Sequence, residues 1–224
     1  MSRTPSEKAM QDRIRWGMWA LPLSGLLSTI AALIPGIGID PAIDPEGFAR
    51  ASSNIGLSNM LGIPSLGLLL IGILALYLFL ARTPVDRPAF IGLLLILVGM
   101  AFFLPFIGVY AFMAPVLGRR YLSGDKTAVN AIPESASITN FTALVFGGTA
   151  VFLLLLGAVM FGTAIWRSKT LPKLSGLVLA IGIILSADPL FYYQPIVWVA
   201  GGALVLFSGV WISSRVYRTT TDSL

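Results

Sequence analysis

Apolar runs of about 20 residues recur along the whole chain, with short polar segments between them. A helix of about this length is needed to cross the hydrocarbon core of a bilayer. Hydrophobic residues make up 56% of the 224 residues and charged residues 11%, whereas about a quarter of a soluble domain is charged. Because a backbone in lipid must satisfy its own hydrogen bonds, these runs predict helices. We expect an all-α bundle of six transmembrane helices at residues 16–36, 60–81, 88–117, 140–166, 172–188 and 191–213.

The two ends of the chain are polar and frame a single membrane domain. Residues 1–15 and 214–224 are expected to be cytoplasmic tails, and residues 16–213 the transmembrane domain. A small-residue cleavage pattern does not follow the first apolar run, so the first helix is expected to stay uncleaved. Between the fifth and sixth helices, Pro189 and Pro195 prevent one continuous helix and predict a tight reversal.

The basic residues are distributed unevenly between the two sides of the predicted membrane domain. Six crossings place both tails on one side, and eleven of the 15 Lys and Arg residues fall in the tails and the even-numbered loops. The positive-inside rule therefore predicts that both termini are cytoplasmic. The net charge of +5 then reflects membrane topology and does not indicate nucleic-acid binding. Membrane lipids, above all anionic lipids of the inner leaflet, are the expected partners.

Three carboxylates lie in the segment GIDPAIDPEGFARASS, residues 38–53, between the first two apolar runs. They allow two interpretations, a cation site or the start of a helix. The alternating oxygen ligands and the glycine position of a calcium loop are missing. Asp44 suits an N-cap, Pro45 the first helical position, and Glu46 the positive end of the helix dipole. We therefore expect a short amphipathic helix on the outer surface, between the first two crossings.

The expected membrane interior carries little reactive chemistry. The chain has no Cys and no His, which removes the commonest ligands of zinc, haem and iron–sulfur clusters. Asp, Glu, Lys and Arg are missing from the middle of every predicted helix, and intramembrane charges are what mark ion paths and proton relays. The sequence thus predicts no catalytic residue, no metal site and no cofactor, and it argues against ion-coupled transport.

Small residues recur at a spacing of four on the predicted fourth and fifth helices. Such pairs allow two helix backbones to approach closely. They predict either packing within one bundle or an interface with another subunit. The candidate packing residues are Ala143, Gly147, Ala158, Gly162, Gly176 and Ala180.

Pro105, in the run AFFLPFIGVYAF, is the strongest candidate for a helix kink. A proline inside a helix removes one hydrogen bond and bends the axis. A kink beside Gly108 would open a lateral pocket for a lipid or another apolar molecule, or it would simply fit the helix to its neighbours. The sequence leaves both alternatives open.

The turn ADPLFYYQP carries the candidate residues for binding a polar group, at a depth that a lipid headgroup can reach. In a membrane enzyme acting on headgroups, these residues would work with the outer carboxylates Asp44 and Glu46. The alternative is that Asp188 is a turn residue before Pro189. The ligand-binding candidates are Asp188, Tyr192, Tyr193 and Gln194.

Four segments together resemble a broad family of uncharacterised bacterial multi-pass membrane proteins: DPEGFARASS, LALYLFLAR, LPFIGVYAF and FGTAIWRSKTLPKLSGLVLAIGIIL. The resemblance covers nearly the full chain. It implies a location in the bacterial inner (plasma) membrane and a multi-pass topology, and it transfers no active site to this chain.

Three functions are compatible with these observations. The first is a non-enzymatic structural or accessory subunit of a membrane assembly, with other membrane proteins as partners. The second is a binder, carrier or sensor of an uncharged apolar molecule such as a lipid, quinone or isoprenoid. The third is a membrane enzyme acting on lipid headgroups, which the missing interior chemistry makes the weakest of the three.

Overall fold

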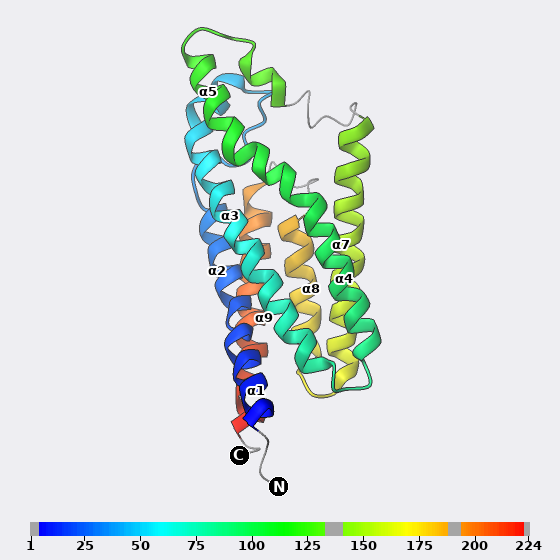
Figure 1. Ribbon diagram of the computed structural model, residues 1–224. Helices are drawn as coiled ribbons and strands as arrows, with labels where there is room; N and C mark the ends of the chain where they lie inside the picture. Colours follow the sequence, from blue (N-terminus) through cyan, green and yellow to red (C-terminus); the bar gives the residue numbers. More distant parts are fainter. Residues whose placement is uncertain (1–4, 133–140, 188–193, 222–224) are drawn as a thin grey trace.

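The computed structural model describes residues 5–132, 141–187 and 194–221, and their regular structure is entirely helical (Figure 1). The prediction of an all-α bundle is confirmed. Its elements, in chain order, are α1 (Pro5–Met18), α2 (Ala20–Ala32), α3 (Pro45–Leu80), α4 (Asp86–Gly108), a π-helical segment (Val109–Met113), α5 (Ala114–Leu122), a 3₁₀ turn (Ala128–Asn130), α7 (Phe141–Ser168), α8 (Lys173–Ala187) and α9 (Pro195–Thr221).

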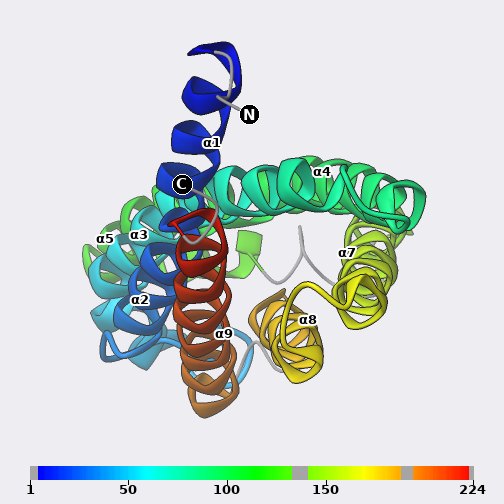
Figure 2. The same ribbon diagram turned by 90° about the horizontal axis from the view of Figure 1, so that it is seen from below.

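Six helices form a closed ring in the order α2, α3, α4, α7, α8 and α9, and α9 returns to contact α2 (Figure 2). Within the ring, α3 and α4 are inclined relative to α7, α8 and α9, so they cross one side of the bundle diagonally (Figure 1). Consecutive helices are neighbours except at the closure, where α2 meets α9. The ring therefore depends on a contact between the two ends of the chain.

Four helical segments are long and apolar enough to span a membrane: Pro45–Leu80, Asp86–Leu122, Leu144–Ser168 and Pro195–Arg218. The apolar helix Lys173–Ser186 is shorter, and α2 has 13 residues. These lengths are compatible with an integral membrane protein. The count of six crossings stays a prediction.

Helix α3 begins where the sequence predicts, at Pro45. The side chain of Asp44 accepts a hydrogen bond from the Gly47 backbone N–H at 2.8 Å, and Glu46 pairs with Arg50 one turn later. The helix-start interpretation is confirmed. The helix does not end before the membrane segment, however, but continues for 36 residues, or about 54 Å. The expected surface helix and the second membrane helix are thus one element, because the polar residues between them are accommodated inside the helix.

The first turns of α3 and the end of the α4–α5 helix extend together beyond the rest of the bundle (Figure 1). We call residues 45–58, 110–122 and 128–132 the cap. It has a hydrophobic core of its own, which includes Phe48, Ile55 and Val129. A Cβ atom on Gly118 would lie 2.9 Å from the Ala49 carbonyl oxygen, so α5 and α3 are in backbone contact here.

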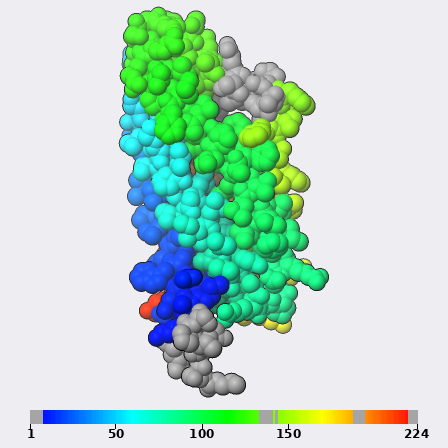
Figure 3. Space-filling view, in the orientation of Figure 1, coloured from blue at the N-terminus to red at the C-terminus, as the bar shows by residue number. Residues whose placement is uncertain are grey.

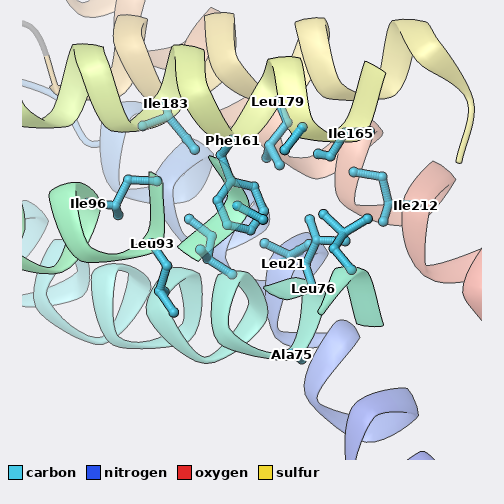
Figure 4. Close-up of a cluster of buried hydrophobic side chains, with 14 of the residues drawn as sticks. Leu21, Ala75, Leu76, Leu93, Ile96, Phe161, Ile165, Leu179, Ile183 and Ile212 are labelled. Carbon is cyan, nitrogen blue, oxygen red and sulfur yellow. The ribbon is translucent and has the colours of Figure 1, made fainter. Parts of the chain in front are cut away.

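The other half of the ring is filled by a larger core cluster, to which every helix of the ring contributes (Figure 4). Phe161 from α7 is 1% exposed and lies among Leu93 and Ile96 of α4 and Leu179 of α8. Ile14 and Met18 of α1 belong to the same cluster. The N-terminal segment that the sequence describes as a tail is therefore helical from Pro5 and packed onto the bundle.

Candidate functional site: the seam between α3 and α4

Glycines bring neighbouring helices of the ring into backbone contact. At the closure of the ring, a Cβ atom on Gly25 would lie 2.2 Å from the Leu206 backbone nitrogen. On the facing helix, a Cβ atom on Gly202 would lie 2.8 Å from the Thr29 backbone nitrogen. Real Cβ atoms do not approach this closely, so α2 and α9 pack at a distance that only glycine permits.

We call the contact between two neighbouring helices of the ring a seam. Four further seams have the same close backbone contact at glycine. A Cβ atom on each of the glycines concerned would lie within 3.1 Å of backbone atoms on the neighbouring helix. These glycines are Gly72 between α2 and α3, Gly92, Gly99 and Gly157 between α4 and α7, Gly162 and Gly176 between α7 and α8, and Gly182 and Gly201 between α8 and α9. Among the described residues, five of the six seams are thus closed by glycine.

The seam between α3 and α4 differs. Gly62 of α3 is the glycine that faces α4, and its Cβ atom would lie 4.0 Å from Ile107 Cγ2, at ordinary van der Waals distance from a side chain. The two helices are joined at their ends instead. At one end they are linked by the short turn between Leu80 and Asp86. At the other end the cap brings the backbones together, because a Cβ atom on Gly56 would lie 3.1 Å from the Ala111 carbonyl oxygen.

Side-chain burial along this seam falls in the middle, near Gly62. Towards the turn, Ile73 of α3 and Ile96 of α4 are fully buried. In the middle of the seam, Leu66 and Phe103 are half-buried, although both pack against the larger core cluster. In the cap the core is closed again. We call the middle of the seam the window and define it by Gly62, Ile63, Leu66, Phe103 and Ile107. Atoms of α9 are visible between α3 and α4 at this level (Figure 3).

The π-helical segment explains why the seam closes above the window. Pro105 has no backbone N–H to give to the helix, and the widened turns of Val109–Met113 follow directly. Tyr110 and Ala111 in this segment are buried in contact with α3, whereas the preceding helix packs against α7. Gly108, at the junction, has open space around its Cα. The sequence-based expectation of an irregularity at Pro105 thus coincides with a real change of helix type.

The chemistry of the window is apolar. Its side chains are aliphatic or aromatic, and none can ionise. On the α7 side, the Phe146 ring packs at a tilt against Phe102, with ring centroids 4.5 Å apart, and against Phe106 at 6.2 Å, and these contacts lie in the neighbouring seam. Such a surface can hold an apolar chain or ring, but it offers no group for acid–base or nucleophilic chemistry.

Three of the four ligand residues that the sequence predicts lie in a part of the chain that the structure does not describe, so their ligand role stays a prediction. Asp188, Tyr192 and Tyr193 lie outside the described residues. Gln194 is exposed and immediately precedes α9. Of the four candidate residues, the structure thus describes one, Gln194, and places it at the surface.

The predicted packing residues lie on α7 and α8. Gly162 and Gly176 face each other, each with its missing Cβ within 2.8 Å of the other's carbonyl oxygen. A Cβ atom on Gly147 would lie 3.3 Å from the ring of Phe106. Ala158 and Ala180 are buried in the large core cluster, and Ala143 lies in the first turn of α7. The contacts of Gly147, Gly162 and Gly176 are with helices of the same chain, and both packing alternatives stay predictions.

No protein-family model, curated protein or solved structure matches this chain. The assignment of a function therefore depends on the chain's own geometry. Among the described residues, no group of three or more metal-ligating side chains comes together. The carboxylates of Asp40 and Asp44 each accept a backbone N–H at 2.8 Å, which gives both of them a local structural role.

The window residues were not identified as a site from the sequence. The nearest signal was the combination of Pro105 and Gly108, which suggested a lateral pocket on one helix. What the sequence could not indicate is that Gly62 to Leu66 of α3 lie opposite, because that pairing depends on the angle between the two helices.

Proposed function

We propose that this protein is an integral membrane protein that binds an uncharged, apolar molecule of the bilayer through the window between α3 and α4. The observation that supports this most directly is the difference between the seams. Five are closed by glycine-mediated backbone contacts, and the sixth has half-buried apolar side chains at its middle. A seam that is held in its middle by side-chain contacts alone can part and admit a ligand sideways from the lipid, without passage through water.

The class of ligand follows from the lining. Without a charge or a strong hydrogen-bonding group in the window, an ionic headgroup would gain nothing there and would lose its hydration. An acyl chain, an isoprenoid chain or a quinone tail meets no such penalty. Because the surrounding lipid is as apolar as the window, binding depends on the fit of shape and not on transfer out of water. A ligand with branched or rigid segments, which loses less conformational entropy on binding, suits such a site best.

The test is to identify the apolar molecules that remain with the protein after extraction in a mild detergent. Gly62→Leu fills the window, whereas Gly67→Leu adds the same side chain on the same helix at an exposed position with nothing within 4 Å of a Cβ atom. We expect one stoichiometric apolar species with the native protein and with Gly67→Leu, and its loss from Gly62→Leu. A bulk lipid mixture with the native protein would contradict the proposal.

We also propose that the protein resides in a bacterial inner membrane with both termini in the cytoplasm. The support is the clustering of basic residues in the tails and in the turns around Arg82 and Lys169, at one end of the bundle. The chain has no native cysteine, so single cysteines at Lys169 and Ser123 can report each side without background. In intact cells, an impermeant maleimide should label the Ser123 position and spare the Lys169 position; the reverse pattern would invert the topology.

A second candidate function, that of an accessory subunit, is favoured by the surface of the cap. Ile43, just before the cap, is 83% exposed, and Leu122 within it is 53% exposed. Apolar side chains outside the hydrocarbon region suit contact with another protein. Native mass spectrometry of protein taken from its own membrane separates the two functions, because fixed protein partners support the accessory role and a single apolar adduct supports the binder.

A further inference from the structure

Helix α1 is attached to the bundle along one side. Met10, Ile14 and Met18, spaced at helical intervals, pack into the large core cluster beside the ends of α3 and α9. The contact is close, because a Cβ atom on Gly17 would lie 2.8 Å from Ala75 Cβ. Seen from the end of the bundle, α1 projects outward from the ring instead of continuing its axis (Figure 2). It therefore lies on the outside of the bundle, at the end where α3 and α9 terminate.

The depth of α1 can be estimated from its contact with α3. Ala75 precedes Arg82 by seven residues, so it lies about 10 Å along the helix towards the middle of the bundle. Arg82 belongs to the exposed basic turn after α3 and marks the headgroup level. The C-terminal half of α1 is therefore at the boundary between headgroups and hydrocarbon, and not in bulk water.

Among the described side chains, the remaining surface of α1 carries three basic residues, one acidic residue, Asp12, and an exposed tryptophan. Lys8 and Arg13 are exposed, and the Trp16 side chain is 79% exposed. Arg15 is held differently, with its guanidinium 4.0 Å from the centre of the Tyr217 ring and 3.8 Å from the Asp12 carboxylate. Lys8 and Arg13 are thus the exposed basic residues among the described side chains of α1.

The rest of this end of the bundle has the same sign of charge. Among the described side chains here, ten are basic and two, Asp12 and Asp86, are acidic. The basic ones are Lys8, Arg13, Arg15, Arg82, Arg87, Arg167, Lys169, Lys173, Arg215 and Arg218. An anionic surface complements this end, and an apolar ring such as Trp16 favours the same interfacial layer.

We propose that α1 is an interfacial helix that binds anionic phospholipid headgroups. Lys8 and Arg13 contact the phosphate groups, and Trp16 inserts beside them at the level of the glycerol backbone. The bilayer, and not a protein, is the occupant because charge, depth and the exposed indole all match a lipid interface. This inference does not depend on the window, which lies at another level of the bundle.

The probe is vesicles of phosphatidylcholine with or without phosphatidylglycerol, in which the full chain is reconstituted. One basic residue near an anionic surface strengthens binding about fivefold, so Lys8→Gln with Arg13→Gln should weaken retention of phosphatidylglycerol about 25-fold. The matched control is Arg119→Gln with Arg120→Gln, which removes two exposed charges at the cap. We expect the control to retain phosphatidylglycerol as the native protein does. Equal losses in both variants would overturn the proposal, and so would an absence of preference for the anionic lipid.

The position of Trp16 is tested separately by fluorescence quenching with brominated lipids. The difference between the native protein and Trp16→Phe isolates this residue from the other tryptophans, and an exposed side chain should tolerate the change. Stronger quenching of Trp16 by brominated phosphatidylglycerol than by brominated phosphatidylcholine supports the proposal. Quenching by aqueous iodide alone would place α1 in water. Protection from iodide and from both lipids would indicate a protein partner, and either result would overturn the proposal.

Discussion

Replacing Gly25 by alanine should separate the two helices that close the ring. The added Cβ atom would lie 2.2 Å from the Leu206 backbone nitrogen, 2.6 Å from its Cα and 2.8 Å from the Gly202 carbonyl oxygen. All three are backbone atoms, so a rotamer change cannot relieve the overlap. The optimal separation between non-bonded heavy atoms is about 3.5 Å or more, so α2 and α9 must move apart by about 1 Å.

The cost can be estimated from the packing that this movement removes. A gap of 0.5–1 Å forfeits about a quarter to a half of the dispersion energy of each contact that it opens. Overpacking in a core typically costs about 1–3 kcal/mol, and here the hydrogen bond from the Thr29 hydroxyl to the Gly25 carbonyl lies at the same place. We expect a loss of about 2–4 kcal/mol in the free energy of unfolding.

The measurement is equilibrium unfolding in mixed detergent micelles, followed by tryptophan fluorescence. Gly148→Ala is the control, because it adds the same methyl group to a helix at an exposed position with nothing within 4 Å. That variant should equal the native protein or exceed it slightly, since alanine is the better helix former. If Gly25→Ala unfolded within about 0.5 kcal/mol of Gly148→Ala, the backbone contact between α2 and α9 would not be as close as described.

Two further predictions concern residues that directly flank the segments of the cap. Asp44→Ala should destabilise the start of α3 by about 1 kcal/mol because it removes the N-cap bond to Gly47, whereas Asp44→Asn should retain most of that stability; hydrogen exchange of the first turn of α3 measures both. The pKa of Asp125 is lowered from its ordinary 3.8, first by the hydrogen bond from the Thr127 hydroxyl and also by the nearby Arg120. Its stabilising effect on the loop is therefore present above pH 3.8 and is lost as the pH falls through the lowered pKa. Thr127→Val should raise the pKa of Asp125 in a carboxyl NMR titration. The control is Ser123→Ala, which should leave that pKa unchanged because the Ser123 hydroxyl donates to the Arg120 carbonyl and not to Asp125. An equal shift in both variants would contradict the assignment.

Local signals in the sequence placed the helices well and their ends less well. The start of α3 was predictable because Asp44, Pro45 and Glu46 act within one turn. The continuity of α3 was not, because hydropathy falls between Ser52 and Asn59. The structure accommodates these residues by hydrogen bonds within and between helices, such as Ser58 Oγ to the Ala31 carbonyl at 2.8 Å and Asn59 Nδ2 to the Ile55 carbonyl at 2.9 Å.

The window was beyond the reach of sequence for a related reason. Pro105 and Gly108 indicated a departure from regular helix on one of the two helices of the seam, α4. Its other side, from Gly62 to Leu66, carries no distinctive pattern, and Gly62 resembles the glycines that close other seams. Whether a glycine brings two helix backbones into contact or faces a side chain depends on which helix lies opposite and at what inclination.

The sequence by itself determined that this chain folds into apolar helices suited to a membrane, and where several of them begin. These properties depend on hydropathy over about 20 residues and on capping within a turn, which are local quantities. The tertiary structure decided the ring, the cap, the docking of α1 and the seam between α3 and α4 that lacks a glycine-mediated backbone contact. Helix α9 meets the N-terminal helices through contacts between residues almost a full chain apart, as between the Ser213 hydroxyl on α9 and the Met18 carbonyl at the end of α1, at 2.9 Å. Such contacts depend on helix geometry in three dimensions, which a linear pattern does not specify.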